Sequence, residues 1–128
     1  MTPQRIARGI AALGLFFWLG SGVWSMVAPK SFFDNLATYP PYNEHLFHDI
    51  GAFSIGIGSF VVFALLGWTA LQVALGGLAV ASMLHAVAHI MDSGEGGKDS
   101  DPLSLSIFAL VMVAGAVATH RQAARETV

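Results

Sequence analysis

The sequence predicts an all-α integral membrane protein, built as a four-helix bundle with its N and C termini in the cytoplasm. Two observations indicate this class. Of the 128 residues, 55% are apolar and only 11% are charged, against about 25% charged in ordinary globular domains. The few charges also lie almost entirely between or beyond four long apolar stretches. This is the pattern of membrane-spanning helices joined by polar connections.

Each apolar stretch is long enough to cross a bilayer, which requires about 20 apolar residues per helix. We expect one domain over residues 1–128, with helices at about 6–27, 44–66, 69–91 and 103–119. Prolines and glycines mark the connections, including the Pro40-Pro41 pair before the second helix. The first apolar run follows Arg5 and Arg8, but it is too long for a signal peptide and lacks a small-residue cleavage site. We therefore interpret it as a retained span.

Basic residues are distributed unevenly around these helices. Four flank the two termini and two lie in the first and third connections: Arg5, Arg8, Arg121, Arg125, and Lys30 and Lys98. Because cytoplasmic segments carry the excess of Lys and Arg, the termini are expected in the cytoplasm. We expect a multi-pass protein of the inner (plasma) membrane, with the lipid bilayer as its main partner. No basic patch indicates nucleic-acid binding, and the absence of cysteine excludes disulfides and thiolate-held metals.

Polar side chains gather at the start of the second helix. The segment NEHLFHDIGAF carries Glu44, His45, His48 and Asp49 within two helical turns. Ionisable groups at the centre of a membrane helix cost about 2.5 to 3.5 kcal/mol each. So many ionisable groups in one short segment therefore predict a functional site that faces the bundle interior.

A second pair of histidines lies near the end of the third helix, in LHAVAHIMD. The second and third helices are joined by a tight turn at residues 67–69, so they are expected to be antiparallel neighbours. Counted from this turn at 1.5 Å per residue, Asp49, His85 and His89 lie about 25 to 32 Å away, near the outer face. Small residues on the face of Asp49, including Ala52, are expected to pack against the third helix. This packing would bring the two histidine groups together.

The expected meeting of these groups predicts a metal site. Helical residues three or four apart project to one side, so the two helices would offer imidazole nitrogens and a carboxylate to one ion. This donor set suits a divalent transition metal such as zinc, copper, iron or manganese. The predicted ligands are His45, His48, Asp49, His85 and His89, with Glu44 and Asp92 accepting imidazole N–H groups.

Alternatives to metal binding stay open. The cluster would move protons in a quinone- or lipid-linked membrane oxidoreductase component, which would make the protein an enzyme. It would hold haem or quinone as a cofactor, although a tight turn between the two helices leaves little room for a macrocycle. As a third alternative, it would be a purely structural cluster in a homo-oligomer or in an assembly subunit of a larger membrane complex.

Two other groups of residues are interpreted as structural. Phe16, Phe17 and Trp18 in the first helix are expected to face lipid or to pack in the core. Asp101 and Pro102 fit the N-cap and first position of the fourth helix. Neither group is assigned to the site.

The first helix, ARGIAALGLFFWLGSGVWSMVAPKSFF, resembles in layout the start of DoxX-like small bacterial membrane proteins. The shared features are an arginine near the N-terminus, a glycine-rich apolar run, and then proline and aromatic residues. The resemblance extends to the four-helix layout over most of the chain. It implies a bacterial inner-membrane bundle from a group in which some members are linked to quinone-dependent oxidation. No family motif falls on NEHLFHDIGAF or LHAVAHIMD, so the resemblance assigns no functional residue.

Overall fold

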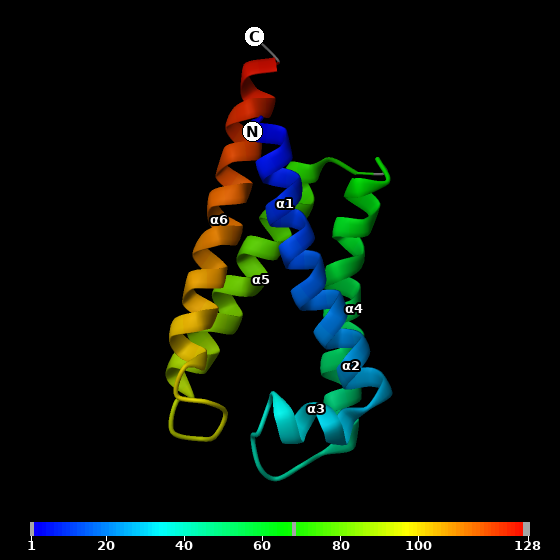
Figure 1. The fold of residues 1–128 in the computed structure, drawn as a ribbon, viewed down its shortest axis with the longest axis vertical. Coiled ribbons are helices and arrows are strands. Elements are labelled where there is room, and N and C mark those ends of the chain that lie inside the picture. Colours follow the sequence, from blue (N-terminus) through cyan, green and yellow to red (C-terminus); the bar gives the residue numbers. More distant parts are fainter. Residues whose placement is uncertain (1, 68, 127–128) are drawn as a thin grey trace.

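The structure, a computed structural model, describes residues 2–67 and 69–126. The chain is helical between short connections, which confirms the all-α class (Figure 1). Its elements are α1 (Pro3–Leu15), the π-helical segment η1 (Phe16–Gly20), α2 (Ser21–Val27), α3 (Pro29–Asn35), α4 (Glu44–Leu65), α5 (Leu71–Met91) and α6 (Asp101–Glu126). The elements α1, η1 and α2 are continuous and form the first span.

Within the described residues, four stretches are long and apolar enough to cross a membrane: Gln4–Val27, Glu44–Leu65, Leu71–Met91 and Asp101–Ala124. Their surfaces carry large apolar side chains such as Phe16 and Phe53, which are 80% and 75% exposed. Such surfaces suit contact with lipid hydrocarbon and support a multi-pass membrane protein. The first span begins and α6 ends at the same end of the bundle (Figure 1). The cytoplasmic location of that end stays a prediction.

The helices differ from those expected mainly in two regions of the chain. The fourth helix is longer at both ends, and α3 occupies a segment that was expected to be a connection. Pro29 begins α3 because its fixed φ suits the first helical position. The helix is held by Phe32, whose buried ring lies 5.9 Å from that of Phe47 on α4. At the turn between the second and third spans, Gly67 follows α4 with φ +79°, whereas Trp68 lies outside the described residues.

The first span crosses the bundle and changes partners along its length (Figure 1). Its N-terminal part lies against α6, where a Cβ atom on Gly115 would be 2.8 Å from Cγ2 of Ile10. Its C-terminal part lies along α4, where a Cβ atom on Gly22 would be 2.8 Å from the backbone nitrogen of Ile55. A Cβ atom on Gly58 of α4 would be 2.9 Å from the backbone nitrogen of Leu19. At Gly22 and Gly58 two helix backbones touch, as is typical of membrane helix pairs.

The prediction that the face of α4 carrying Asp49 and Ala52 packs against α5 is wrong. The two helices are joined at one end of the bundle and diverge toward the other (Figure 1). We call the end formed by the connections 28–43 and 92–100 the loop end, and the opposite end the terminal end. Ala52, which was expected to face α5, is exposed. The helix instead uses Gly51, which is one residue or about 100° away around α4, and it turns this face to the first span.

Candidate ligand cavity at the loop end

A cavity of about 510 Å³ lies between the two groups of helices that diverge at the loop end. One side is formed by α5 and α6, and the other by η1, α2, α3 and α4 with the connection that follows α3. Its volume falls within the range of about 300–1,000 Å³ found for small-molecule sites. Its lining includes an aromatic wall of Phe17, Trp18, Phe32 and Phe47, and a polar group of Tyr39, His85, His89 and Asp101.

Part of the aromatic wall comes from η1. A π-helical turn carries an extra residue and is frequent at functional sites. The neighbouring residues Phe17 and Trp18 both line the cavity, and their rings meet edge to face at 5.4 Å. The indole of Trp18 is almost completely buried, and its N–H donates to Oγ of Ser82 on α5 at 3.3 Å. This hydrogen bond joins the first span to α5 and holds the indole in the cavity wall.

His85 projects from α5 beside this wall. Its ring centroid lies 5.6 Å from that of Trp18 and 6.1 Å from that of Phe17. The side chain is partly buried. Over the part of the chain that the structure describes, neither ring nitrogen of His85 takes part in a hydrogen bond. The imidazole therefore keeps a donor and an acceptor for a molecule inside the cavity.

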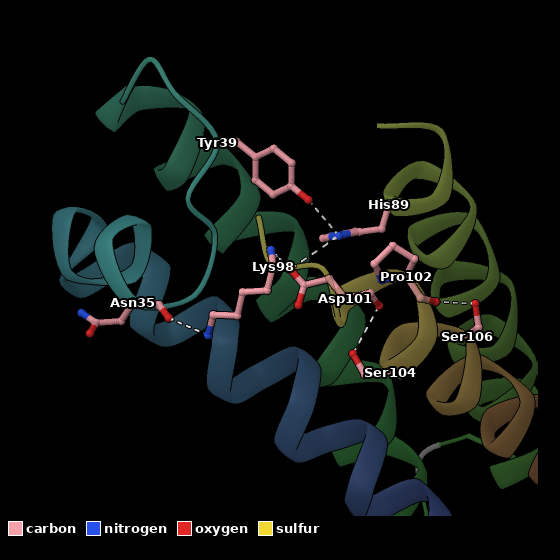
Figure 2. Close-up of polar contacts among 8 residues, drawn as sticks. All are labelled: Asn35, Tyr39, His89, Lys98, Asp101, Pro102, Ser104 and Ser106. Carbon is pink, nitrogen blue, oxygen red and sulfur yellow. Dashed lines mark hydrogen bonds and ion pairs between the residues drawn. The ribbon is translucent and has the colours of Figure 1, made fainter. Parts of the chain in front are cut away.

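Polar contacts join the two sides of the loop end (Figure 2). The backbone N–H of Gly97 donates to the carbonyl oxygen of Thr38 at 2.9 Å. Nζ of Lys98 donates to the backbone carbonyl oxygen of Asn35 at 3.0 Å. The hydroxyl of Tyr39 lies 2.9 Å from Nδ1 of His89. We call these three contacts the latch, because they connect the diverging halves of the bundle across the cavity.

Asp101 supports the latch from the first residue of α6. Its Oδ2 atom accepts the backbone N–H of Lys98 at 2.9 Å and lies 4.0 Å from Nδ1 of His89. Burial, followed by the charges of Asp101 and Asp92, raises the pKa of Tyr39 above its ordinary value of 10.0. Tyr39 is therefore a neutral hydroxyl at physiological pH, and it donates to Nδ1 of His89 when that nitrogen carries no proton.

The predicted metal site is wrong. Within residues 2–67 and 69–126, no group of three or more histidine and acidic side chains is placed to hold a metal ion. Among the residues that the structure describes, the side chains of His45 and Asp49 pair only with each other, at 3.5 Å, and they are 86% and 52% exposed. His48 is partly exposed and does not line the cavity. Because α4 turns the face of Gly51 toward the first span, its polar residues point away from α5. Among the described residues, they form no buried His/Asp cluster with the histidines of α5.

The remaining predicted site residues divide between the two locations. His85, His89 and Asp92 line the cavity, whereas Glu44 is exposed and outside it. The prediction also assigned to the ionisable groups of α4 the insertion cost of the bilayer centre, and this assumption is wrong. Asp49 is only about 8 Å from the start of the helix at 1.5 Å per residue, near enough to the end of the span to reach water or headgroups. The insertion cost that applies at the centre of a bilayer does not apply there.

Sequence reasoning missed several cavity residues. Phe16 is exposed on the protein surface, which fits the expected contact with lipid. Phe17 and Trp18 instead form part of the cavity wall. A signal was present, because a buried indole N–H in an apolar span needs a hydrogen-bond partner. That requirement points to a polar residue of another span, which is Ser82. The sequence around Tyr39 contains no comparable indication, because the position of this side chain depends on the path of the connection after α3.

Comparison of the chain with known protein families, with curated proteins and with solved structures finds no match. The functional proposal therefore rests on the geometry of the cavity.

Proposed function

We propose that the protein is a multi-pass plasma-membrane protein that binds a lipophilic molecule with a planar, oxygen-bearing ring, of the quinone class, in the loop-end cavity. The observation that carries the proposal is His85, whose unbonded ring nitrogens face an aromatic cavity. An imidazole N–H would donate to a ring carbonyl, and the other ring nitrogen, which carries no proton, would accept from a ring hydroxyl. The aromatic side chains would contact the faces and edges of the ring.

Two residues of α4 that line the cavity favour a ligand that also has an apolar tail. Leu46 and Ile50 line the cavity and are also 52% and 39% exposed on the protein surface. Side chains that belong to both the lining and the surface mark the place where the cavity reaches the outside. A lipophilic ligand would enter and leave there from the edge of the hydrocarbon, while its polar ring lies against His85.

A bis-histidine haem is disfavoured by the same geometry. His85 and His89 are one helical turn apart on α5, with ring centroids 4.7 Å apart. Two axial ligands of a haem iron must approach it from opposite faces of the macrocycle. Neighbouring side chains on one face of one helix approach from the same side, so this pair cannot supply both ligands.

The proposal is tested with the purified full-length protein in a mild detergent, titrated with a short-chain benzoquinone and followed by quenching of tryptophan fluorescence. The variant His85→Phe keeps an aromatic ring but removes both nitrogens. We expect its affinity to fall about tenfold, which corresponds to the loss of one hydrogen bond of about 1.4 kcal/mol. Mass spectrometry of a solvent extract of the purified protein would identify any ligand carried from the membrane.

The matched control is His45→Phe, which makes the same chemical change on the exposed surface of α4. It should leave the quinone affinity unchanged, because His45 is not part of the cavity lining. Quenching that never saturates, or an equal loss of affinity in both variants, would contradict the proposal.

A further inference from the structure

A second pocket, of about 310 Å³, lies at the terminal end of the bundle between α1, α5 and α6. Its polar lining consists of one cation, three side-chain amides and one hydroxyl: Arg8, Gln4, Gln72, Gln122 and Thr119. No acidic residue is among the described residues that line it. Gln4 and Arg8 are exposed, so the pocket can be reached from the protein surface.

The pocket lies where three membrane spans begin or end. The apolar stretches that surround it start at Gln4 and Leu71 and finish at Ala124, and Gln4 and Leu71 themselves line the pocket. Lipid headgroups occupy this depth at the edge of the hydrocarbon. A ligand held here would therefore be positioned as a headgroup is, with any acyl chains running toward the bilayer centre.

The pocket offers two kinds of hydrogen-bonding group. Arg8 presents a guanidinium, whose planar set of donors matches the oxygens of a phosphate. The first turn of α5 adds positive potential, since its N-cap residue, Ala70, supplies no side-chain acceptor for the free backbone N–H groups. Gln72 presents the opposite chemistry, because its Oε1 atom is buried and accepts no hydrogen bond. A buried acceptor without a partner is costly, so it favours a ligand that brings a donor.

We infer that this pocket binds the headgroup of a glycerophospholipid that has both a phosphate and a terminal N–H or O–H donor. The phosphate lies on Arg8. A half-turn of the terminal amide of Gln72, which lines the pocket, brings its unpartnered Oε1 atom out of its buried position to accept the terminal donor. Phosphatidylethanolamine and phosphatidylglycerol meet both requirements. Phosphatidylcholine carries the same phosphate but ends in a trimethylammonium group without a donor, so it distinguishes the role of Gln72 from that of Arg8.

The test is native mass spectrometry of the full-length protein in a mild detergent, mixed with equal amounts of phosphatidylethanolamine and phosphatidylcholine. We expect phosphatidylethanolamine to be retained about tenfold more, the effect of one hydrogen bond that involves a charged group. Arg8→Gln should reduce retention of both lipids. Arg5→Gln is the matched control, since Arg5 is an exposed residue of the same helix and does not line the pocket.

Gln72→Leu provides a second and independent variant. It should remove the preference between the two lipids, and it should fold stably because it deletes an unpartnered buried atom. If Arg8→Gln does not fold, this variant decides the question. Equal retention of the two lipids by the unaltered protein, or equal losses in Arg5→Gln and Arg8→Gln, would overturn the inference. Displacement of the lipid by inorganic phosphate would also overturn it, by assigning the pocket to a free anion.

Discussion

The pair His45 and Asp49 on α4 and the pair His85 and His89 on α5 have the same spacing of four residues and opposite environments. On α4, His45 and Asp49 have side chains that are 86% and 52% exposed. On α5, the side chain of His89 is only 16% exposed, and it bonds to Tyr39 inside the latch. Spacing decides which side chains share a face of a helix. The packing of the neighbouring helices decides whether that face is inside, and this is what separates a surface ion pair from a cavity wall.

Glycines determine the orientation of α4. Its inner face carries Gly51 and Gly58, and a Cβ atom on Gly51 would lie 2.9 Å from the carbonyl oxygen of Gly22. Ser54 is buried between them. Because the first span occupies this face, α4 cannot also turn it toward α5. The cavity is the space that remains at the loop end where α4 and α5 diverge.

The largest expected effect comes from changing this glycine contact. Gly51→Ala forces the backbones of α4 and α2 apart, because the added Cβ atom meets backbone atoms that cannot rotate away. We expect it to lower the free energy of unfolding by about 2 kcal/mol or more, as over-packing does. The measurement is unfolding with a denaturing detergent, starting from mild-detergent micelles. Quinone binding should weaken in parallel, because α4 supplies one wall of the cavity.

Gly56→Ala is the control for this prediction. The same substitution five residues further along α4 places a Cβ atom with nothing within 4 Å. It should be neutral or slightly stabilising, because alanine favours a helix over glycine by up to about 1 kcal/mol. If the two variants unfold alike, the packing of α4 on the first span is not what orients its histidines.

Two tryptophans allow the buried wall to be compared with the surface. Trp18 donates to Ser82 and Trp24 donates to Ser31, both at 3.3 Å, but only the first bond is buried. Trp18→Phe should therefore lower the free energy of unfolding by about 1 to 1.5 kcal/mol, because the Ser82 hydroxyl is left unpaired. It should also weaken quinone binding. Trp24→Phe should change both quantities little, since water replaces the lost partner.

The sequence predicted the class and the spans well, but not the way in which the spans pack. Charge segregation and apolar length locate Glu44–Leu65 and Leu71–Met91 to within a few residues of the expected bounds, because membrane insertion depends on local composition. Packing depends on which of the two small-residue faces of α4 contacts a neighbouring helix. Both Gly51 and Gly56 are compatible with close approach, and only the opposing backbone of Gly22 distinguishes them.

The candidate site was predicted in part for the same reason. His85 and His89 lie on the face of α5 that was expected to be polar and internal, Asp92 directly follows that helix, and all three line the cavity. Their partners were sought on α4 but lie on the first span, on the connection after α3 and at the start of α6. Tyr39 reaches His89 across 50 positions of sequence, and no local pattern encodes such a contact. The predicted homo-oligomer or larger complex stays a prediction.

Alkaline pH should weaken the latch. The pKa of Tyr39 is raised in the folded protein, so the folded state favours the neutral hydroxyl. Its stabilising contribution is present below the ordinary value near 10 and is lost as the pH rises above it. We expect the concentration of denaturing detergent at the unfolding midpoint to decrease as the pH rises above about 10. Tyr39→Phe should remove the part of this dependence that belongs to the latch and should cost about 0.5 to 1 kcal/mol at pH 7.

The smallest effect is expected at the exposed pair on α4, and it tests the comparison most directly. Asp49→Asn removes the charge that faces His45 at 3.5 Å, but both side chains are largely exposed. Surface pairs of this kind contribute less than about 0.5 kcal/mol because solvent screens them. Asp101→Asn makes the same substitution at a side chain that is 18% exposed and supports the latch. It should destabilise the protein more and weaken quinone binding. If Asp49→Asn had the larger effect on binding, the functional site would lie on α4 and not in the cavity.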